Sequence, residues 1–350
     1  AYAADQVTNI KPSEVSISGA QGYQSGYQID GVSNNSRLST GNGQGDKNLA
    51  QDVSGHSQEA FVNVNILEQL EVYDSNIPAK YGQFSGGLVL AKTQNAGNKT
   101  RFGFSYRQTA DQFVEYHKFY APDFDGDKVF DTATFNKKDF NAYLLMPLND
   151  NSGVVAQIQI LKSEETLNQL GELRVQKQTN YNALLKYHYS LTDEDELTLR
   201  YLNAPYKGEY FDVGAINSDY DVNGGGQSFL AQWQADRQWG YMDTQLDWRQ
   251  STNSKDTTSA RYVWLNAPGK AWGNYDGATS SLEGGYGDID KVQNSYSFKQ
   301  DFTLPNIWQR IGEHELSFGY QFEHQKTIFD RLESSVVYNG AVISPKINCN

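Results

Sequence analysis

Four aspartates in the segment DFDGDKVFD have the spacing of a calcium-binding loop. Asp123, Asp125, Asp127 and Asp131 stand at offsets 1, 3, 5 and 9, where carboxylate oxygens surround a hard cation such as Ca²⁺. The glycine stands at offset 4 rather than 6, and Thr134 replaces the bidentate glutamate at offset 12. The segment is therefore a candidate Ca²⁺ site, with a merely acidic loop as the alternative.

The other groups that do chemistry form no recognisable catalytic site. The histidines lack the close spacing of metal ligands, and no glycine-rich phosphate loop follows a strand and opens a helix. The single cysteine, Cys349, has no internal partner for a disulfide. We expect no enzyme activity and no required cofactor.

Aromatic side chains are the stronger candidates for ligand contacts. They gather in segments between the predicted strands, where stacking surfaces suit sugars or peptides. The alternative is that they only pack the loops together. These residues are Tyr206, Tyr210, Phe211, Tyr220, Trp264, Trp272, Tyr275 and Tyr286.

The segments that must position these loops alternate strictly between apolar and polar residues. In YNALLKYHYSL, Tyr181 and Leu185 fall on one face and Asn182 and Lys186 on the other, which predicts a strand with period two rather than a helix. The same pattern recurs near 102–107, 140–146, 154–161, 197–201, 228–236, 242–249, 295–304 and 315–323. We therefore predict nine strands of about nine to eleven residues, the length that crosses a bilayer with a tilt.

The predicted connections alternate in length. After every second strand they are short, as in NDNSG, TDEDE, WGY and PNIWQRIGE, whereas 108–138, 162–179, 203–226 and 250–293 are long. This alternation is typical of outer-membrane barrels, which have tight periplasmic turns and extended outer loops. A soluble β-sandwich with aromatic core faces is the alternative.

Composition agrees with a barrel that has one face in lipid and one in water. Hydrophobic residues are 38% of the 350-residue chain while aromatic residues reach 13%, and mean hydropathy is -0.66. The formal net charge of -13 argues against nucleic acid as a partner. No apolar run is long enough for a transmembrane helix, and AYAADQV has no features of a signal peptide.

The first hundred residues contain the most specific sequence motifs. ISGAQGYQSGYQIDGVSNNS (17–36) and ILEQLEVYDSNIPAKYGQFSGGLVLAKTQ (66–94) resemble the plug domain of TonB-dependent outer-membrane receptors, with the family's elements in order. The matching plug positions include Asp30, Gly31, Glu68, Glu71, Tyr81, Gly82, Gly86 and Gly87. One departure is Ser18, where the family usually has an arginine of the plug-to-barrel lock, so the resemblance implies that this lock is carried elsewhere.

The resemblance implies a small mixed α/β plug domain over residues 1–98 and the first strands of a large all-β antiparallel transmembrane barrel over 99–350. Barrels of this family have about 22 strands around a plugged lumen, so we expect a longer protein than this chain. Within the plug, Gly86-Gly87 is expected to permit close backbone approach, with a simple β-bulge as the alternative.

By the same resemblance, we expect a multi-pass protein of a Gram-negative outer membrane, in contact with its lipid and lipopolysaccharide. It would bind a scarce extracellular ligand, namely a carbohydrate, a peptide or a metal chelate, and import it actively. TonB would engage a segment upstream of residue 1 by strand addition. The long loops are most similar to the Oar-like branch. A passive porin and an outer-membrane adhesin or structural barrel are the alternatives.

Overall fold

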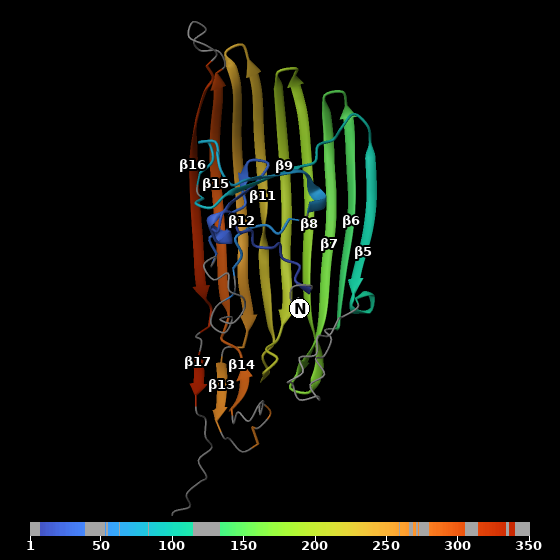
Figure 1. Ribbon diagram of the computed structural model, residues 1–350, viewed down its shortest axis with the longest axis vertical. Helices are drawn as coiled ribbons and strands as arrows, with labels where there is room; N and C mark the ends of the chain where they lie inside the picture. The colour runs from blue at the N-terminus through green and yellow to red at the C-terminus, as the bar shows by residue number, and fades with distance from the viewer. Residues whose placement is uncertain are drawn as a thin grey trace, which may run out of the picture.

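Three β-sheets, one large and two small, make up the described part of the protein in a computed structural model (Figure 1). It describes residues 8–38, 53, 55–62, 64–82, 84–114, 134–258, 260–265, 269–270, 272, 280–304, 314–333 and 336–339. Four parts of the sequence-based predictions lie outside the described residues: the aspartates of the predicted Ca²⁺ loop, Tyr275, Cys349 and the connection PNIWQRIGE.

Nine long strands form one antiparallel sheet, in which each strand pairs with the next in the chain. The number of barrel strands and their antiparallel order confirm the prediction. The strands are β5 (Arg101–Ala110), β6 (Thr134–Asn149), β7 (Ser152–Gln169), β8 (Glu172–Thr192), β9 (Asp195–Tyr210), β11 (Tyr220–Arg237), β12 (Gly240–Thr257), β15 (Ile289–Leu304) and β16 (Leu316–Arg331).

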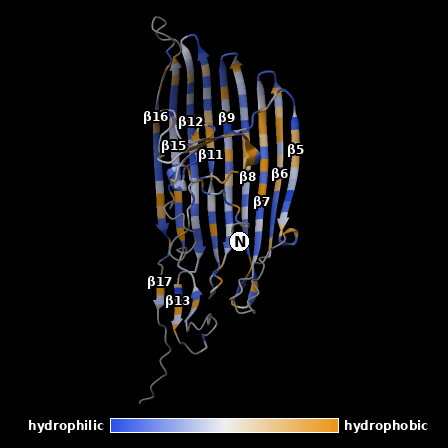
Figure 2. Ribbon diagram, viewed as in Figure 1, coloured by the Kyte–Doolittle hydropathy of each residue, from blue (hydrophilic) through white to orange (hydrophobic). Residues whose placement is uncertain are grey.

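The two faces of this sheet are inverted relative to a soluble protein. Leu185 is 54% exposed while the flanking Leu184 and Lys186 are 3% and 4% exposed, and Ile158 is 55% exposed between a Gln157 and a Gln159 that are buried. Figure 2 shows the resulting alternation of hydrophobic and hydrophilic bands along the strands. An apolar outer face of this kind has the pattern of a lipid-facing barrel wall.

The strands are longer than predicted, and one predicted loop is not a loop. β6 to β9, β11, β12, β15 and β16 have 16 to 21 residues each. The segment 162–179 continues the β7–β8 ladder to a two-residue turn at Leu170-Gly171. The prediction was wrong there because it took each strand to end with its apolar alternation. The hydrogen-bonded pairing of β7 and β8 continues beyond that point.

The short connections behave as predicted where they are described. The β6–β7, β8–β9 and β11–β12 turns lie at one end of the sheet, the top in Figure 1, and the longer excursions lie at the other end. Segments 203–226 and 250–293 are only partly loop, since β9, β11, β12 and β15 extend into them.

A four-stranded sheet from the first part of the chain lies against one face of the large sheet (Figure 1). Its order is β2 (Val32–Ser33), β1 (Gly26–Ile29), β4 (Leu88–Thr93), β3 (Leu67–Tyr73), with β1 and β4 parallel. Between Asn9 and Thr93 the described residues also form two 3-10 turns, Gly22–Gln24 and Val64–Ile66, but no α-helix. The region, called the plug below, is thus a mixed sheet with loops. The boundary at residue 98 stays a prediction.

Gly86 and Gly87 immediately precede β4 at a point of close packing. A Cβ on Gly87 would meet the Tyr73 carbonyl oxygen at 2.6 Å and Ile17 Cγ2 at 2.4 Å, and one on Gly86 would meet Ala20 Cβ at 2.5 Å. Gly87 also accepts a backbone hydrogen bond from Gly26. The two glycines therefore permit the close approach that their position in the sequence suggested.

A second small sheet stands beyond the long-loop end of the barrel strands (Figure 1). Its order is β10 (Ala215–Ile216), β14 (Ser280–Gly284), β13 (Ala260–Leu265), β17 (Val336–Asn339). We call it the loop sheet. It gives a fixed frame to side chains from the β12–β15 connection.

No helix among the described residues is both long and apolar enough to cross a membrane.

Candidate functional site

The hairpin between β1 and β2 brings the plug into close contact with the barrel wall. Its two turn residues, Asp30 and Gly31, have φ values of 51° and 80°, as a two-residue turn that matches strand twist requires. A Cβ on Gly31 would meet the Gln245 side chain at 2.8 Å. The turn therefore places the Asp30 carboxylate directly at the barrel wall.

The Asp30 carboxylate joins the plug to two barrel strands. One oxygen accepts from Arg200 Nη1 at 3.1 Å, and Lys186 Nζ lies 4.0 Å from the other. Thr93, at the end of β4, donates to the same carboxylate from its backbone N–H and its hydroxyl at 2.8 and 2.7 Å. All three charged side chains are almost fully buried. We call this cluster the Asp30 anchor.

The charge state of the anchor follows from its partners. Burial alone would raise the pKa of Asp30, but Arg200, Lys186 and the two bonds from Thr93 outweigh it and hold the pKa below its ordinary value. Arg200 also donates to the Ile29 carbonyl at 2.7 Å. The resemblance implies a plug-to-barrel lock carried elsewhere than at Ser18, and a barrel arginine and a plug aspartate form a charged contact of that kind here.

A second buried charge cluster lies on β12. Arg249, 3% exposed, contacts three carboxylates: Glu59 from the plug at 3.3 Å, Asp247 at 3.1 Å, and Glu323 on β16. It also donates to the Ser33 carbonyl. Burial, only partly offset by Arg249 and aided by the two neighbouring acids, raises the pKa of Glu59 to about 7.

Sequence reasoning missed Arg200, Arg249 and Glu59. The two arginines stand at inward positions of strictly alternating strands, where most neighbours are neutral polar residues. A charge at an inward strand position was therefore the available signal. Glu59 had none, because it belongs to an irregular plug segment.

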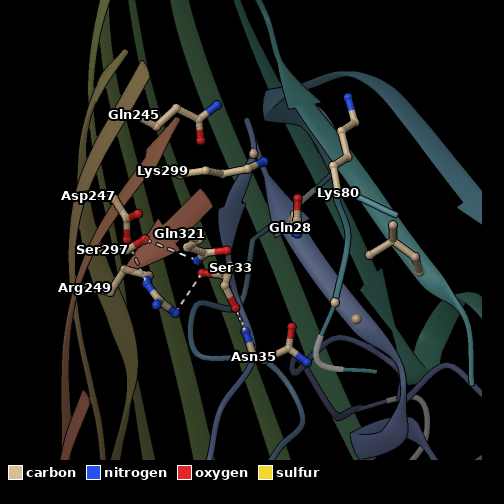
Figure 3. Close-up of a pocket in the computed structure, with 14 residues that line it drawn as sticks. Gln28, Ser33, Asn35, Lys80, Gln245, Asp247, Arg249, Ser297, Lys299 and Gln321 are labelled. Atoms are coloured by element: carbon tan, nitrogen blue, oxygen red, sulfur yellow. Dashed lines mark hydrogen bonds and ion pairs between the residues drawn. The ribbon is translucent and has the colours of Figure 1, made fainter. Parts of the chain in front are cut away.

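Polar cavities separate the plug from the wall beside these clusters. Figure 3 shows one, with Gln28 and Lys80 of the plug facing Gln245 and Lys299 of the barrel. These four residues also line a neighbouring cavity of about 350 Å³ that extends past Asp30 towards the short-turn end. Apolar contacts also join the two parts, since Ile29 and Ile66 of the plug pack with Leu184 and Leu202 of the wall. The plug is thus seated through buried charges, apolar packing and polar cavities together.

Of the other plug motif residues, Gly86 and Gly87 lie in the close packing before β4, whereas Glu68, Glu71, Tyr81 and Gly82 are partly or fully exposed. Glu71 is on β3 and accepts from the Tyr73 hydroxyl, and Glu68 is on the same strand. Lys299 Nζ of β15 lies 5.9 Å from the centroid of the Tyr81 ring. A Cβ added to Gly82 would have no other atom within 4 Å. Only Asp30 and Gly31 of this set therefore contribute to the anchor.

Four of the predicted aromatic residues gather at the long-loop end of the wall. Tyr206 and Tyr210 share a hydroxyl contact, and the Tyr210 and Tyr220 rings stack with centroids 5.4 Å apart. Lys255 lies over the rings of both Tyr220 and Tyr286, at 4.8 and 6.0 Å. We call the four tyrosines, Tyr206, Tyr210, Tyr220 and Tyr286, the tyrosine wall.

The plug covers part of the tyrosine wall. Tyr206 is 3% exposed, its ring meets Phe61 edge-on at 5.6 Å, and Lys11 lies over it at 4.9 Å. A ligand therefore reaches Tyr206 only when the plug segments around Lys11 and Phe61 move.

The remaining described aromatics are separate from this wall. Phe211 is buried beneath the guanidinium of Arg174. Trp264 and Trp272 lie at the loop sheet, where both contact Lys270. The predicted ligand residues thus form two groups and one isolated packing residue.

No group of three or more His, Cys, Asp or Glu side chains within the described part of the chain is arranged to hold a metal ion. The Ca²⁺ prediction at Asp123, Asp125, Asp127 and Asp131 concerns residues outside that part, and it remains a prediction.

Comparisons with known proteins extend over nearly the whole chain. The chain is 27% identical to the curated Escherichia coli protein described as "Uncharacterized protein YddB", over 94% of its own length and 43% of that protein's. No family model matches it.

Solved structures share the fold. The crystal structure of the outer membrane transporter YddB from Escherichia coli superposes with a TM-score of 0.78 at 23% identity, covering 96% of this chain and 45% of that one. The siderophore receptor PirA from Acinetobacter baumannii gives 0.58 at 14% identity, covering 89% and 42%. A mutant of the ferric enterobactin receptor PfeA from Pseudomonas aeruginosa gives 0.56 at 16% identity, also covering 89% and 42%. The chain thus spans less than half the length of each relative.

Proposed function

We propose, from the plug-and-barrel fold that this chain shares with TonB-dependent outer-membrane transporters, that it belongs to a receptor for active uptake across the outer membrane. The receptor captures an extracellular ligand at the long-loop end and releases it into the periplasm. The relatives with this fold are transporters and receptors rather than enzymes, which agrees with the absence of a catalytic motif in the sequence.

The observation that carries the proposal is a lipid-facing sheet whose inner face is locked to a folded plug. Asp30, Arg200 and Lys186 are buried together at that interface, and separating them leaves uncompensated buried charges. A plug held in this way blocks passive flow. Its release requires work, and we propose that TonB supplies it.

The ligand belongs to one of the predicted classes of carbohydrate, peptide or metal chelate. Two relatives are named as a siderophore receptor and a ferric enterobactin receptor. Against an anionic chelate stands the net charge of -13 in this chain, because an acidic surface repels anions at long range. The tyrosine wall and the loop sheet supply stacking surfaces for the other two classes.

Proteoliposome swelling tests the plugged-transporter proposal against a passive porin. With the full-length protein reconstituted and a small sugar as the solute, we expect no swelling from the wild type. Replacing both Asp30 and Arg200 by alanine should loosen the plug and produce swelling. Rapid swelling with the wild type would favour the porin, and a protein that stays monomeric without detergent would favour the soluble β-sandwich.

A second assay tests the energy source. The full-length receptor should bind the isolated periplasmic domain of TonB in detergent, measured by surface plasmon resonance against a β-barrel porin as the control. Equal signals from receptor and porin would contradict TonB coupling.

A further inference from the structure

A lysine ammonium is held between two indole rings at the loop sheet. Lys270 Nζ lies 4.4 Å from the Trp264 ring centroid and 5.0 Å from that of Trp272. The same nitrogen lies 3.2 Å from Glu283 Oε2. Two aromatic faces and one carboxylate are the groups by which proteins bind alkylammonium ions. We call these three walls the cage.

The walls of the cage are fixed independently of the lysine. Trp264 is on β13 and Glu283 on β14, which pair in the loop sheet, and the Trp264 indole N–H donates to Glu283 at 2.9 Å. Trp272 is held by a bond from its indole N–H to the Leu282 carbonyl at 3.0 Å. The cage is therefore preorganised, and its occupant enters on a flexible side chain.

The second face of Trp264 is also occupied, which orients the cage. Tyr262 stacks on Trp264 with centroids 5.3 Å apart and planes 7° apart, and Tyr338 stacks on Tyr262 at 4.9 Å. Rings this close leave no space for an ammonium between them, so Lys270 lies on the opposite face of Trp264. The stack presents one indole face to a cation and supports it from behind.

The carboxylate stays charged without the lysine. Burial alone would raise the pKa of Glu283, but bonds from Trp264, Lys270 and Asn217 outweigh it and lower the pKa. Two of these three donors remain when Lys270 is replaced. The emptied cage then presents a negative charge between two indoles.

The occupant is accessible to exchange. The Lys270 and Glu283 side chains are 32% and 20% exposed, and a partly exposed ion pair contributes little to stability. Displacement of Lys270 from the cage by an ammonium from outside therefore costs the protein little stability. The acidic net charge of the chain favours the approach of a cation.

We propose that the cage of Trp264, Trp272 and Glu283 binds an alkylammonium group of the extracellular ligand, with the side chain of Lys270 as the internal occupant that this group displaces. The inference rests on the proposed receptor function and specifies its ligand as one that carries a lysine-like amine. Of the predicted ligand classes, a basic peptide fits this chemistry.

The test is binding to the purified full-length protein, followed by tryptophan fluorescence. The probe is a lysine derivative with both backbone ends blocked, and the matched control probe is the equally blocked norleucine, which lacks the ammonium. Replacing Lys270 by alanine should tighten lysine-probe binding by about tenfold, whereas norleucine should not bind. Replacing the exposed Lys162 of β7 by alanine should leave binding unchanged.

Further variants separate a cage from a nonspecific effect. In the Lys270→Ala background, Glu283→Gln should remove the preference for the charged probe, and Trp272→Ala should abolish binding, with the heat-dependent gel mobility of the folded barrel unchanged. Equal binding of both probes, or none by a folded Lys270→Ala protein, would overturn the inference.

This outcome is independent of transport. Amine binding by a protein that fails the swelling and TonB assays contradicts the receptor proposal but not the cage, whereas a working transporter without amine binding contradicts only the cage.

Discussion

Asp30 is a single carboxylate that connects the first plug hairpin, the end of the last plug strand and two barrel strands. Its partners are Thr93, Lys186 and Arg200. A buried ion pair often adds little net stability, but removal of one partner is costly because the other charge stays buried. The anchor therefore matters most for whether the plug remains seated.

Replacing Asp30 by alanine should destabilise plug seating by about 3–5 kcal/mol, because Arg200 and Lys186 lose their shared carboxylate. Hydrogen exchange at the amides of β1 and β4 in the full-length protein measures this. The control is Asp219→Ala, which removes a 62%-exposed partner of Arg174 and should cost less than about 1 kcal/mol. Equal protection in both variants would contradict the anchor.

Glu59 should make plug seating depend on pH. Its pKa is about 7 in the folded protein against an ordinary 4.5, so the folded state holds the extra proton between these values. The stabilisation is complete below pH 4.5 and is lost as the pH rises to about 7, on the order of 3 kcal/mol in total. The main reason is burial, which raises the pKa of Glu59 and which Arg249 offsets only in part because Arg249 also contacts Asp247 and Glu323.

Hydrogen exchange of the plug amides at pH 5 and pH 7.5, corrected for intrinsic exchange rates, measures this dependence. Glu59→Gln should abolish the difference while leaving the barrel protected. Weaker protection at pH 5 than at pH 7.5 in the wild type would show that the sign is wrong.

At the scale of elements, the plug sheet depends on how closely its loops approach the start of β4. Gly87→Ala should destabilise the plug by about 1–3 kcal/mol, because the added Cβ would meet the Tyr73 carbonyl at 2.6 Å. Gly82→Ala is the matched control, since no atom lies within 4 Å of its Cβ. Hydrogen exchange of the plug amides at increasing urea concentration measures the stability of the plug in both variants. Similar losses of stability in the two variants would contradict close packing at Gly87.

At the scale of the whole molecule, one face of the long sheet has the apolar pattern of a lipid-facing wall over part of its height. Beyond that part, β7 and β8 continue as a paired ladder to the turn at Leu170-Gly171. The free-energy cost of a charged residue on the outer face should therefore depend on its position along the strand. Substitution of two exposed leucines by arginine can measure this dependence.

Leu246→Arg should destabilise the barrel by about 2–4 kcal/mol if residue 246 lies near the bilayer midplane, whereas Leu173→Arg should cost about 0–1 kcal/mol beyond it. Leu246 is 53% and Leu173 72% exposed, so exposure alone predicts the opposite order. Folding of the full-length variants into phospholipid vesicles under urea gives both values. A larger loss for Leu173→Arg would contradict the assigned membrane depth.

The sequence by itself determined the local features: nine alternating strands, the division of the side chains from Tyr181 to Lys186 between two faces, and the short turn-like connections. Period-two alternation and turn chemistry are properties of neighbouring residues, so they can be recognised from the sequence alone. Strand length could not be predicted in this way, because the pairing of 162–169 with 172–179 continues beyond the apolar alternation on which the prediction rested.

Only the tertiary structure decided which buried charges meet and which aromatic residues lie together. Asp30 and Arg200 are 170 residues apart in the chain, and Glu59 meets Arg249 across 190. The cage likewise needs the pairing of β13 with β14 and a lysine from the segment between them. Such contacts depend on the closure of long loops, for which the spacing of residues along the chain gives no signal.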